Sequence, residues 1–125
     1  MSRTIVLVGH CGPDMFMLKS AVGRVVPDAP IVTVNDGAAL APLLCAGSVL
    51  LVNRELDGDF GTTSGIELIQ RAAQGDDAPV MLLISNFPEA QAEAAAAGAR
   101  PGFGKTALYA AETAEILRDA VGKGE

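Results

Sequence analysis

The sequence predicts an α/β fold in which five parallel strands form one sheet and helices cover both of its faces, giving three layers. The first observation is that short apolar runs alternate five times with amphipathic segments. The second is composition, because 50% hydrophobic and 19% charged residues suit strands that are buried on both faces. A length of 125 residues fits a single domain, and we expect residues 1–125 to form it.

The first part of the chain contains two expected strands with a helix between them. A run of apolar and β-branched residues predicts a strand from Thr4 to Val8, and an amphipathic segment predicts a helix from Asp14 to Val26. An Asp-Ala-Pro sequence at 28–30 breaks this helix. The apolar residues that follow predict the second strand, from Ile31 to Val34.

The middle of the chain repeats this pattern. An Asn-Asp-Gly turn opens a helix that we expect from Gly37 to Ala46, and a continuous apolar run then predicts a buried strand from Ser48 to Asn53. After a polar loop, amphipathic spacing predicts a helix from Ser64 to Ala73. A second apolar run predicts the fourth strand, from Pro79 to Ile84.

The last part of the chain completes five strand–helix units. An Ala-rich segment of high helix propensity predicts a helix from Pro88 to Ala97, closed by Gly98. A weaker strand from Arg100 to Gly104 and a helix from Ala107 to Val121 follow. Strands that alternate with such helices imply right-handed crossovers in a parallel, doubly wound sheet. Five strands and compact size favour the flavodoxin-like order 2-1-3-4-5.

Charge and cysteine content exclude several classes of function. The net charge is −6 and the nine basic residues are scattered, so we expect no direct nucleic-acid binding and no membrane-surface binding. No signal peptide or membrane span is evident, which predicts a cytoplasmic protein. Cys11 and Cys45 lie in unlike settings, the second at the end of an expected apolar helix, so we expect reduced thiols.

Asn53 is the most informative residue, because it ends a buried parallel strand at the edge of the sheet where function usually lies. A carboxylate at this position could attack a phosphoryl group and carry it as an acyl phosphate. The amide of asparagine carries no charge and its nitrogen has no free lone pair. Asn53 therefore favours a scaffold that lacks this reaction.

Several segments share one order and spacing. Ser85 directly follows the fourth strand and is itself followed by Asn-Phe-Pro-Glu. An Ala-Ala-Gly-Ala turn at 96–99 precedes the fifth strand, and Lys105 comes after that strand. Gly-Ile-Glu-Leu at 65–68 opens the third helix. Through these segments, the chain from Thr4 to Val121 resembles the receiver domain of two-component response regulators, the CheY-like family. The resemblance implies a (βα)5 fold and a role in phosphorelay signal transduction.

The resemblance also implies where a phosphorylation pocket would lie. In the family, two acidic residues after the first strand and an acceptor aspartate hold Mg²⁺, a cation that prefers oxygen ligands. The acidic pair here becomes Gly9 and His10, or His10 and Cys11, depending on the alignment. The aspartate becomes Asn53, and Gly102 stands where the family places its switch aromatic.

The groups that remain are the Ser85 hydroxyl and the Lys105 ammonium, whose counterparts in the family contact the phosphoryl oxygens. We therefore expect no catalytic residue, no metal and no cofactor. The degenerate pocket consists of Gly9, His10, Cys11, Asn53, Ser85 and Lys105.

Three other interpretations compete with this one. The segment from Ala99 to Thr106 fits a relaxed phosphate-loop pattern, although it follows a helix rather than a buried strand. His10 and Cys11 could make a reactive thiolate or a soft-metal ligand, although adjacent residues rarely point at one ion. An acidic loop could bind a cation, although it lacks the glutamate that a calcium loop requires. Its acidic residues are Glu55, Asp57 and Asp59.

The sequence thus predicts an atypical, receiver-like module that acts by protein–protein interaction without aspartyl phosphorylation, and that is not an enzyme. By the resemblance, its partner is a signalling protein or a second copy of the chain. The contact, or a homodimer, would use the surface of the fourth helix, fifth strand and fifth helix. The alternative is a small-ligand or thiol-redox sensor that uses the remodelled pocket.

Overall fold

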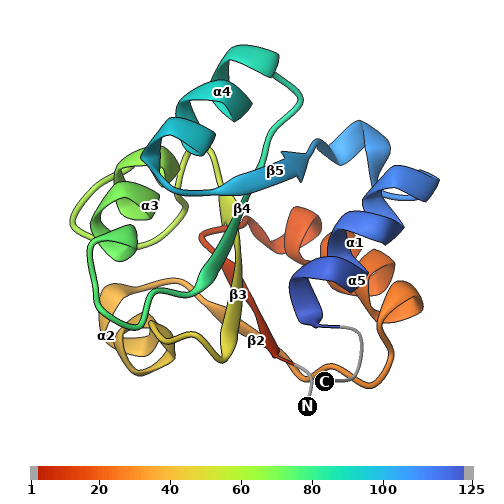
Figure 1. Cartoon of the computed structure of the whole chain (residues 1–125), viewed down its shortest axis with the longest axis horizontal. Coiled ribbons are helices and arrows are strands. Elements are labelled where there is room, and N and C mark those ends of the chain that lie inside the picture. Colours follow the sequence, from red (N-terminus) through yellow and green to blue (C-terminus); the bar gives the residue numbers. More distant parts are fainter. Residues whose placement is uncertain (1–2, 123–125) are drawn as a thin grey trace.

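The computed structural model describes residues 3–122, and these form a parallel sheet between two layers of helices (Figure 1). The strand order is β2-β1-β3-β4-β5, which confirms the predicted order and fold class. The strands begin and end within one residue of their predicted bounds, because most of them are apolar runs bounded by turn residues. They are β1 (Thr4–Val8), β2 (Ile31–Val34), β3 (Ser48–Asn53), β4 (Val80–Ile84) and β5 (Arg100–Phe103).

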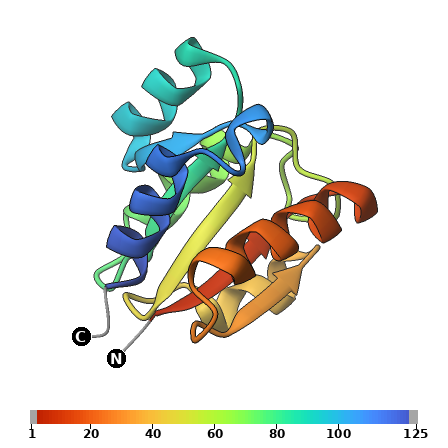
Figure 2. The same cartoon turned by 90° about the vertical axis from the view of Figure 1, so that its right-hand side faces the viewer.

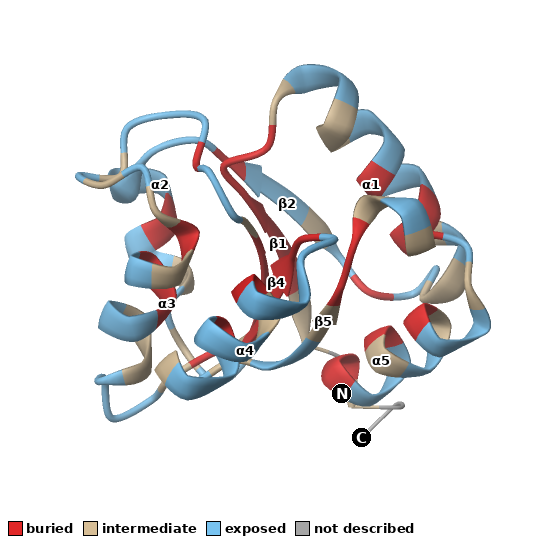
Figure 3. Ribbon diagram, turned by 90° about the horizontal axis from the view of Figure 1, so that it is seen from above, coloured by how far each residue is buried: buried red, intermediate tan, exposed pale blue. Residues whose placement is uncertain are grey.

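Two helices cover one face of the sheet and three cover the other (Figure 1). The first face carries α1 (Gly12–Val25) and α5 (Ala111–Val121). The second face carries α2 (Gly37–Leu40), α3 (Gly65–Ala73) and α4 (Pro88–Ala97). Figure 3 shows that burial is concentrated in the inner strands and on the helix faces turned toward the sheet, whereas the edge strand β2 is largely exposed.

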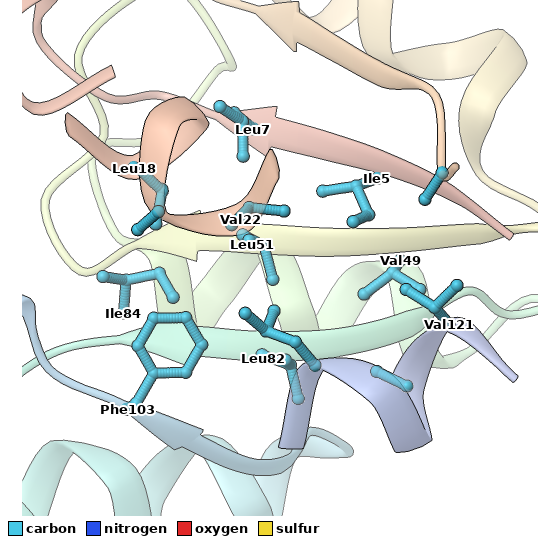
Figure 4. Packing of buried hydrophobic residues seen from close by; sticks show 14 of the residues in the cluster. Ile5, Leu7, Leu18, Val22, Val49, Leu51, Leu82, Ile84, Phe103 and Val121 are labelled. Carbon is cyan, nitrogen blue, oxygen red and sulfur yellow. The ribbon is translucent and has the colours of Figure 1, made fainter. Parts of the chain in front are cut away.

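Each face of the sheet has its own apolar core. On the α1 and α5 side, Leu51 of the central strand packs among residues such as Val22 and Phe103 (Figure 4). On the other side, Leu50 packs with Ile69 and with the small side chains of α4. Alternate residues of each central strand thus enter opposite cores, as a sheet buried on both faces requires.

The register of the strands aligns their carboxyl ends. Val8 lies opposite both Val34 and Val52, and Asn53 lies opposite Ile84. Figure 2 shows the carboxyl end of β3 close to the turn that follows β5. Polar residues that follow different strands are therefore brought to one edge of the sheet.

The prediction of a helix from Gly37 to Ala46 is wrong beyond its first turn. The α-helix ends at Leu40 and a 3₁₀ turn, η1 (Ala41–Leu43), replaces the rest. Pro42 has no amide hydrogen, and its ring would clash with the carbonyl four residues earlier in a continued α-helix. Cys45 consequently lies in a bend after this turn rather than in a helix.

Two other helices also differ from their predicted bounds. α1 begins two residues early, because Pro13 needs no hydrogen-bond partner in the first turn of a helix. The helix expected from Ala107 begins only at Ala111, after a 3₁₀ turn η2 (Lys105–Ala107). The buried Thr113 hydroxyl donates to the Ala107 carbonyl oxygen at 2.6 Å and holds the chain in this separate turn.

The long loop from Arg54 to Thr63 folds back over the carboxyl ends of β1 and β2. Its Leu56 is only 7% exposed and packs against Gly9. The backbone N–H of Asp57 donates to the Gly9 carbonyl, and that of Asp59 donates to the Asn35 carbonyl. The loop is therefore fixed against the carboxyl edge of the sheet.

In the part of the chain described, no helix is long and apolar enough to cross a membrane.

Candidate functional site

The six pocket residues predicted from the sequence all lie at the carboxyl edge of the sheet, but they do not form a single pocket. Asn53, Ser85 and Lys105 line a common cleft of about 240 Å³. His10 does not line this cleft and lies instead beside a small cavity that Lys105 also borders. The cleft is completed by residues that the sequence analysis did not assign to it, namely Arg54, Ile84, Asn86, Phe87 and Glu55.

Asn53 makes two hydrogen bonds that depend on its being an amide. Its side-chain nitrogen donates to the Gly9 carbonyl oxygen at 3.0 Å and to the Glu55 carbonyl oxygen at 2.8 Å. Both partners can only accept, so the nitrogen must face them and the amide oxygen must face away. The side chain thereby ties the end of β3 to the loops that follow β1 and β3.

Gly9 has a structural role at this point. Its φ of 72° lies in the left-handed region, and a Cβ there would approach the Leu56 side chain to 2.7 Å. A side chain is therefore disfavoured both by backbone strain and by crowding. Gly9 allows the chain to turn sharply after β1, so that its carbonyl can accept from Asn53 and from the Asp57 N–H.

The β4 side of the cleft presents a hydroxyl group and an aromatic ring. Ser85 is 8% exposed, and its hydroxyl oxygen accepts from the Phe87 N–H at 3.2 Å, which leaves the hydroxyl hydrogen available. The guanidinium carbon of Arg54 lies 5.2 Å from the centre of the Phe87 ring, a cation–π distance. The Asn86 side-chain oxygen accepts from both the N–H and the hydroxyl of Thr106.

Lys105 pairs with a carboxylate that the sequence analysis did not assign to the site. Its ammonium nitrogen lies 2.5 Å from a carboxylate oxygen of Asp14, in the first turn of α1. The hydrogen bond from Lys105 holds the pKa of Asp14 below its ordinary value of 3.8, with a smaller contribution from the Cys11 thiol. The sequence does show Asp14 as an acidic residue near the start of the first helix. It does not show the pairing of Asp14 with Lys105, because the two residues lie 91 positions apart.

His10 is 1% exposed, and its Nε2 lies 2.8 Å from the Leu51 carbonyl oxygen. Because the carbonyl accepts, Nε2 carries the hydrogen and Nδ1 is an unprotonated acceptor in the neutral ring. Within residues 3–122, Nδ1 is the one buried side-chain nitrogen or oxygen that has no hydrogen-bond partner. Burial lowers the pKa of His10 below 6.5, and the nearby Lys105 charge adds to this shift while the Leu51 carbonyl and Asp14 oppose it.

Cys11 is half-buried and immediately precedes α1. It and Cys45 are both free thiols. Across residues 3–122, no group of three His, Cys, Asp or Glu side chains is arranged to hold a metal ion. Neither the His10–Cys11 pair nor the acidic loop therefore gains support as a metal site.

The phosphate-loop pattern does not have the structure that a phosphate loop needs. The segment forms β5 and η2, and it follows α4 rather than a buried strand. Gly104 packs so closely on Asn86 that a Cβ would lie 1.8 Å from its side-chain oxygen. Lys105 is directed to Asp14. Gly104 therefore allows close packing between Asn86, which follows β4, and the chain after β5.

Comparison with known proteins gives similarity in structure but not in sequence. No family model matches the sequence, and a search of curated proteins finds no match. The signal receiver domain of a DNA-binding response regulator from Colwellia psychrerythraea superposes with a TM-score of 0.70 at 15% identity, covering 94% of this chain and 96% of that one.

Two further solved structures agree. A response regulator from Chloroflexus aurantiacus gives a TM-score of 0.71 at 16% identity, covering 96% of this chain and 98% of that one. A bacteriophytochrome response regulator gives 0.72 at 16% identity, covering 98% of this chain and 79% of that one. Sequence identities this low establish the fold and no more. The chain thus has the CheY-like fold of response-regulator receiver domains.

Proposed function

We propose that this chain is an atypical receiver domain of two-component signal transduction that acts by protein–protein interaction without aspartyl phosphorylation. The observation that carries the proposal is the pair of hydrogen bonds from the Asn53 amide to Gly9 and Glu55. The residue at the end of β3 serves as a structural tie through its nitrogen. A phosphoryl acceptor would need a carboxylate oxygen directed toward the cleft.

The surroundings of Asn53 support the same proposal. The residues directly after β1, Gly9 and His10, supply no oxygen ligand from a carboxylate for Mg²⁺. The Asp14 carboxylate is engaged by Lys105 at 2.5 Å, so the ammonium group already has an anionic partner within the chain. The cleft therefore keeps the Lys105 ammonium and the Ser85 hydroxyl, which supports a receiver pocket that lacks the acidic pair directly after β1 and the aspartate at the end of β3.

A domain without a catalytic group has to act through its surface. We propose a cytoplasmic module, not an enzyme, whose partner is a signalling protein or a second copy of the chain. The proposed contact is the surface formed by α4, β5 and α5, called here the α4–β5–α5 face. The α4 part of this face is smooth, because the exposed residues of α4 other than Glu89 and Glu93 are mainly alanine.

The test is incubation with acetyl phosphate and Mg²⁺, followed by intact mass measurement under conditions that preserve acyl phosphates. We expect no adduct on the wild-type chain. A labile phosphoryl adduct would overturn the proposal and would point to another acceptor. The variants Asp57→Asn and Asp59→Asn, whose side chains lie in the loop over β1 and β2, would then identify it.

A sensor function is the second candidate, and one observation favours it. The partnerless Nδ1 of His10 is a buried acceptor beside a cavity that Asp14 and Lys105 also line. Together with the free Cys11 thiol at the start of α1, it could report ligand binding or thiol oxidation. Mild peroxide treatment of Cys11→Ser and Cys45→Ser variants separates the two candidates. Selective oxidation of Cys11 would favour the sensor, and equal, slow oxidation of both thiols would not.

A further inference from the structure

The pairing of β4 with β5 is irregular at the centre of the α4–β5–α5 face. Leu82 lies opposite Arg100 but Ile84 lies opposite Phe103, so two steps along β4 match three along β5. This is a β-bulge. Gly102 lies within it, and a Cβ there would come within 2.2 Å of the Leu83 carbonyl oxygen. The bulge therefore has no room for a side chain at this position.

The side chain of Gln91, on α4, reaches into this irregular stretch. Its amide nitrogen donates to the Leu83 carbonyl oxygen at 2.8 Å and to the Ser85 carbonyl oxygen at 3.1 Å. Its amide oxygen accepts from the Gly102 N–H at 3.1 Å. The two carbonyls and the N–H leave only one possible orientation of the amide. One side chain thus connects α4, β4 and β5.

Gln91 matters more because the buried side chains of α4 are all small. The buried residues of α4 are Ala90 and Ala94, whose methyl groups bury little apolar surface. Methyl groups fix the position of a helix less strictly than large interlocking side chains do. The three hydrogen bonds of Gln91 add strict distance and angle requirements.

We propose that Gln91 is the positioning residue of the α4–β5–α5 face, holding α4 and β5 in one arrangement through hydrogen bonds. Since Ser85 lines the cleft, Gln91 also links the cleft wall directly to α4. The use of this face for binding rests on the proposed function. The fixed arrangement itself rests only on the contacts described above.

The test compares amide hydrogen exchange, followed by NMR, in the wild type and in the variants Gln91→Met and Gln91→Ala. Methionine keeps most of the volume but cannot make the hydrogen bonds, so it separates hydrogen bonding from packing. Gln70→Ala is the matched control, because Gln70 is exposed on α3. We expect the Gly102 amide to exchange at least about tenfold faster in both Gln91 variants, beyond any change common to all amides, and to be unaffected in the control.

Gly102 exchange in Gln91→Met equal to that of the wild type would overturn the role of Gln91. An effect confined to Gln91→Ala would also overturn it, because packing alone would then explain the arrangement. Neither result bears on phosphorylation. Conversely, a phosphoryl adduct in the mass measurement would overturn the proposed function and leave the exchange result standing.

Discussion

At the residue scale, the hydrogen bonds of Asn53 predict that replacing it with aspartate destabilises the fold. In Asn53→Asp, a carboxylate would face the Gly9 and Glu55 carbonyl oxygens, losing both hydrogen bonds and adding repulsion. We expect the free energy of unfolding to fall by about 2 kcal/mol or more, from two lost bonds at about 1 kcal/mol each. Urea unfolding at pH 7 measures this change.

Asn86→Asp is the matched control for this substitution. Asn86 uses its side-chain oxygen to accept from Thr106, and an aspartate oxygen can accept in the same way. The control should therefore change stability by less than about 0.5 kcal/mol, as most surface substitutions do. Equal stability of Asn53→Asp and the wild type would contradict the structural account of Asn53.

His10 predicts how stability depends on pH. Its pKa is lowered in the folded chain, so the unfolded chain binds a proton first as the pH falls. The stability that neutral His10 supports is therefore complete above about pH 6.5 and is lost progressively from there down to its folded pKa. Because one group titrates, the slope in that window is at most about 1.36 kcal/mol per pH unit.

His10→Gln tests this assignment. His10 is the only histidine of the chain. The pKa values of Asp14 and Glu67 are lowered from 3.8 and 4.5, so these two carboxylates change the stability mainly at pH values below that range. Denaturant unfolding between pH 5 and 7 should thus show a slope in the wild type and a flat profile in the variant. The same slope in both proteins would show that another group is responsible.

At the element scale, Gly65 decides how closely α3 approaches β3. A Cβ at Gly65 would lie 2.0 Å from the Asn53 carbonyl oxygen and 3.0 Å from the Val52 side chain. Because backbone atoms cannot move aside without shifting the helix, we expect Gly65→Ala to destabilise the fold by more than about 2 kcal/mol. Thermal unfolding measured by circular dichroism would show this as a lower Tm.

Gly23→Ala is the control on a helix that makes no such approach. Gly23 lies inside α1, and a Cβ there would meet nothing within 4 Å. Alanine is favoured over glycine inside a helix, so this variant should be more stable by roughly 0.5–1 kcal/mol. If Gly65→Ala lowers the stability and Gly23→Ala raises it, the close approach of α3 to β3, and not helix propensity, explains why position 65 requires glycine.

At the scale of the whole molecule, the sheet is predictable from the sequence and the pairing of distant side chains is not. Buried apolar runs and the topology rules for parallel sheets predict that Asn53 lies at the carboxyl edge of the sheet, and the resemblance to receiver domains adds Ser85 and Lys105 to the same edge. The contact between Lys105 and Asp14 joins residues that no local pattern relates. The apolar residues after Gly37 predicted a longer helix, but α2 ends at Leu40 because Pro42 is unfavourable inside an α-helix.

The charge of the whole molecule yields a prediction about self-association. The exposed charged residues of α4, β5 and α5 comprise five carboxylates and two guanidinium groups, namely Glu89, Glu93, Glu112, Glu115, Asp119, Arg100 and Arg118. A two-fold contact through the α4–β5–α5 face would bring this acidic surface against itself. Screening by salt reduces such repulsion, since the Debye length falls from about 30 Å at 0.01 M to about 3 Å at 1 M.

We therefore expect any homodimer through this face to strengthen as salt is raised, and a complex with a basic partner to weaken. Sedimentation equilibrium at low and high NaCl measures the first, and Glu93→Lys provides the matched variant, because reversing one charge on each copy lowers the repulsion. In that variant the dimer should form at lower salt than in the wild type. A dimer that weakens with salt in both proteins would require a contact surface elsewhere, since attraction between opposite charges would then hold it together.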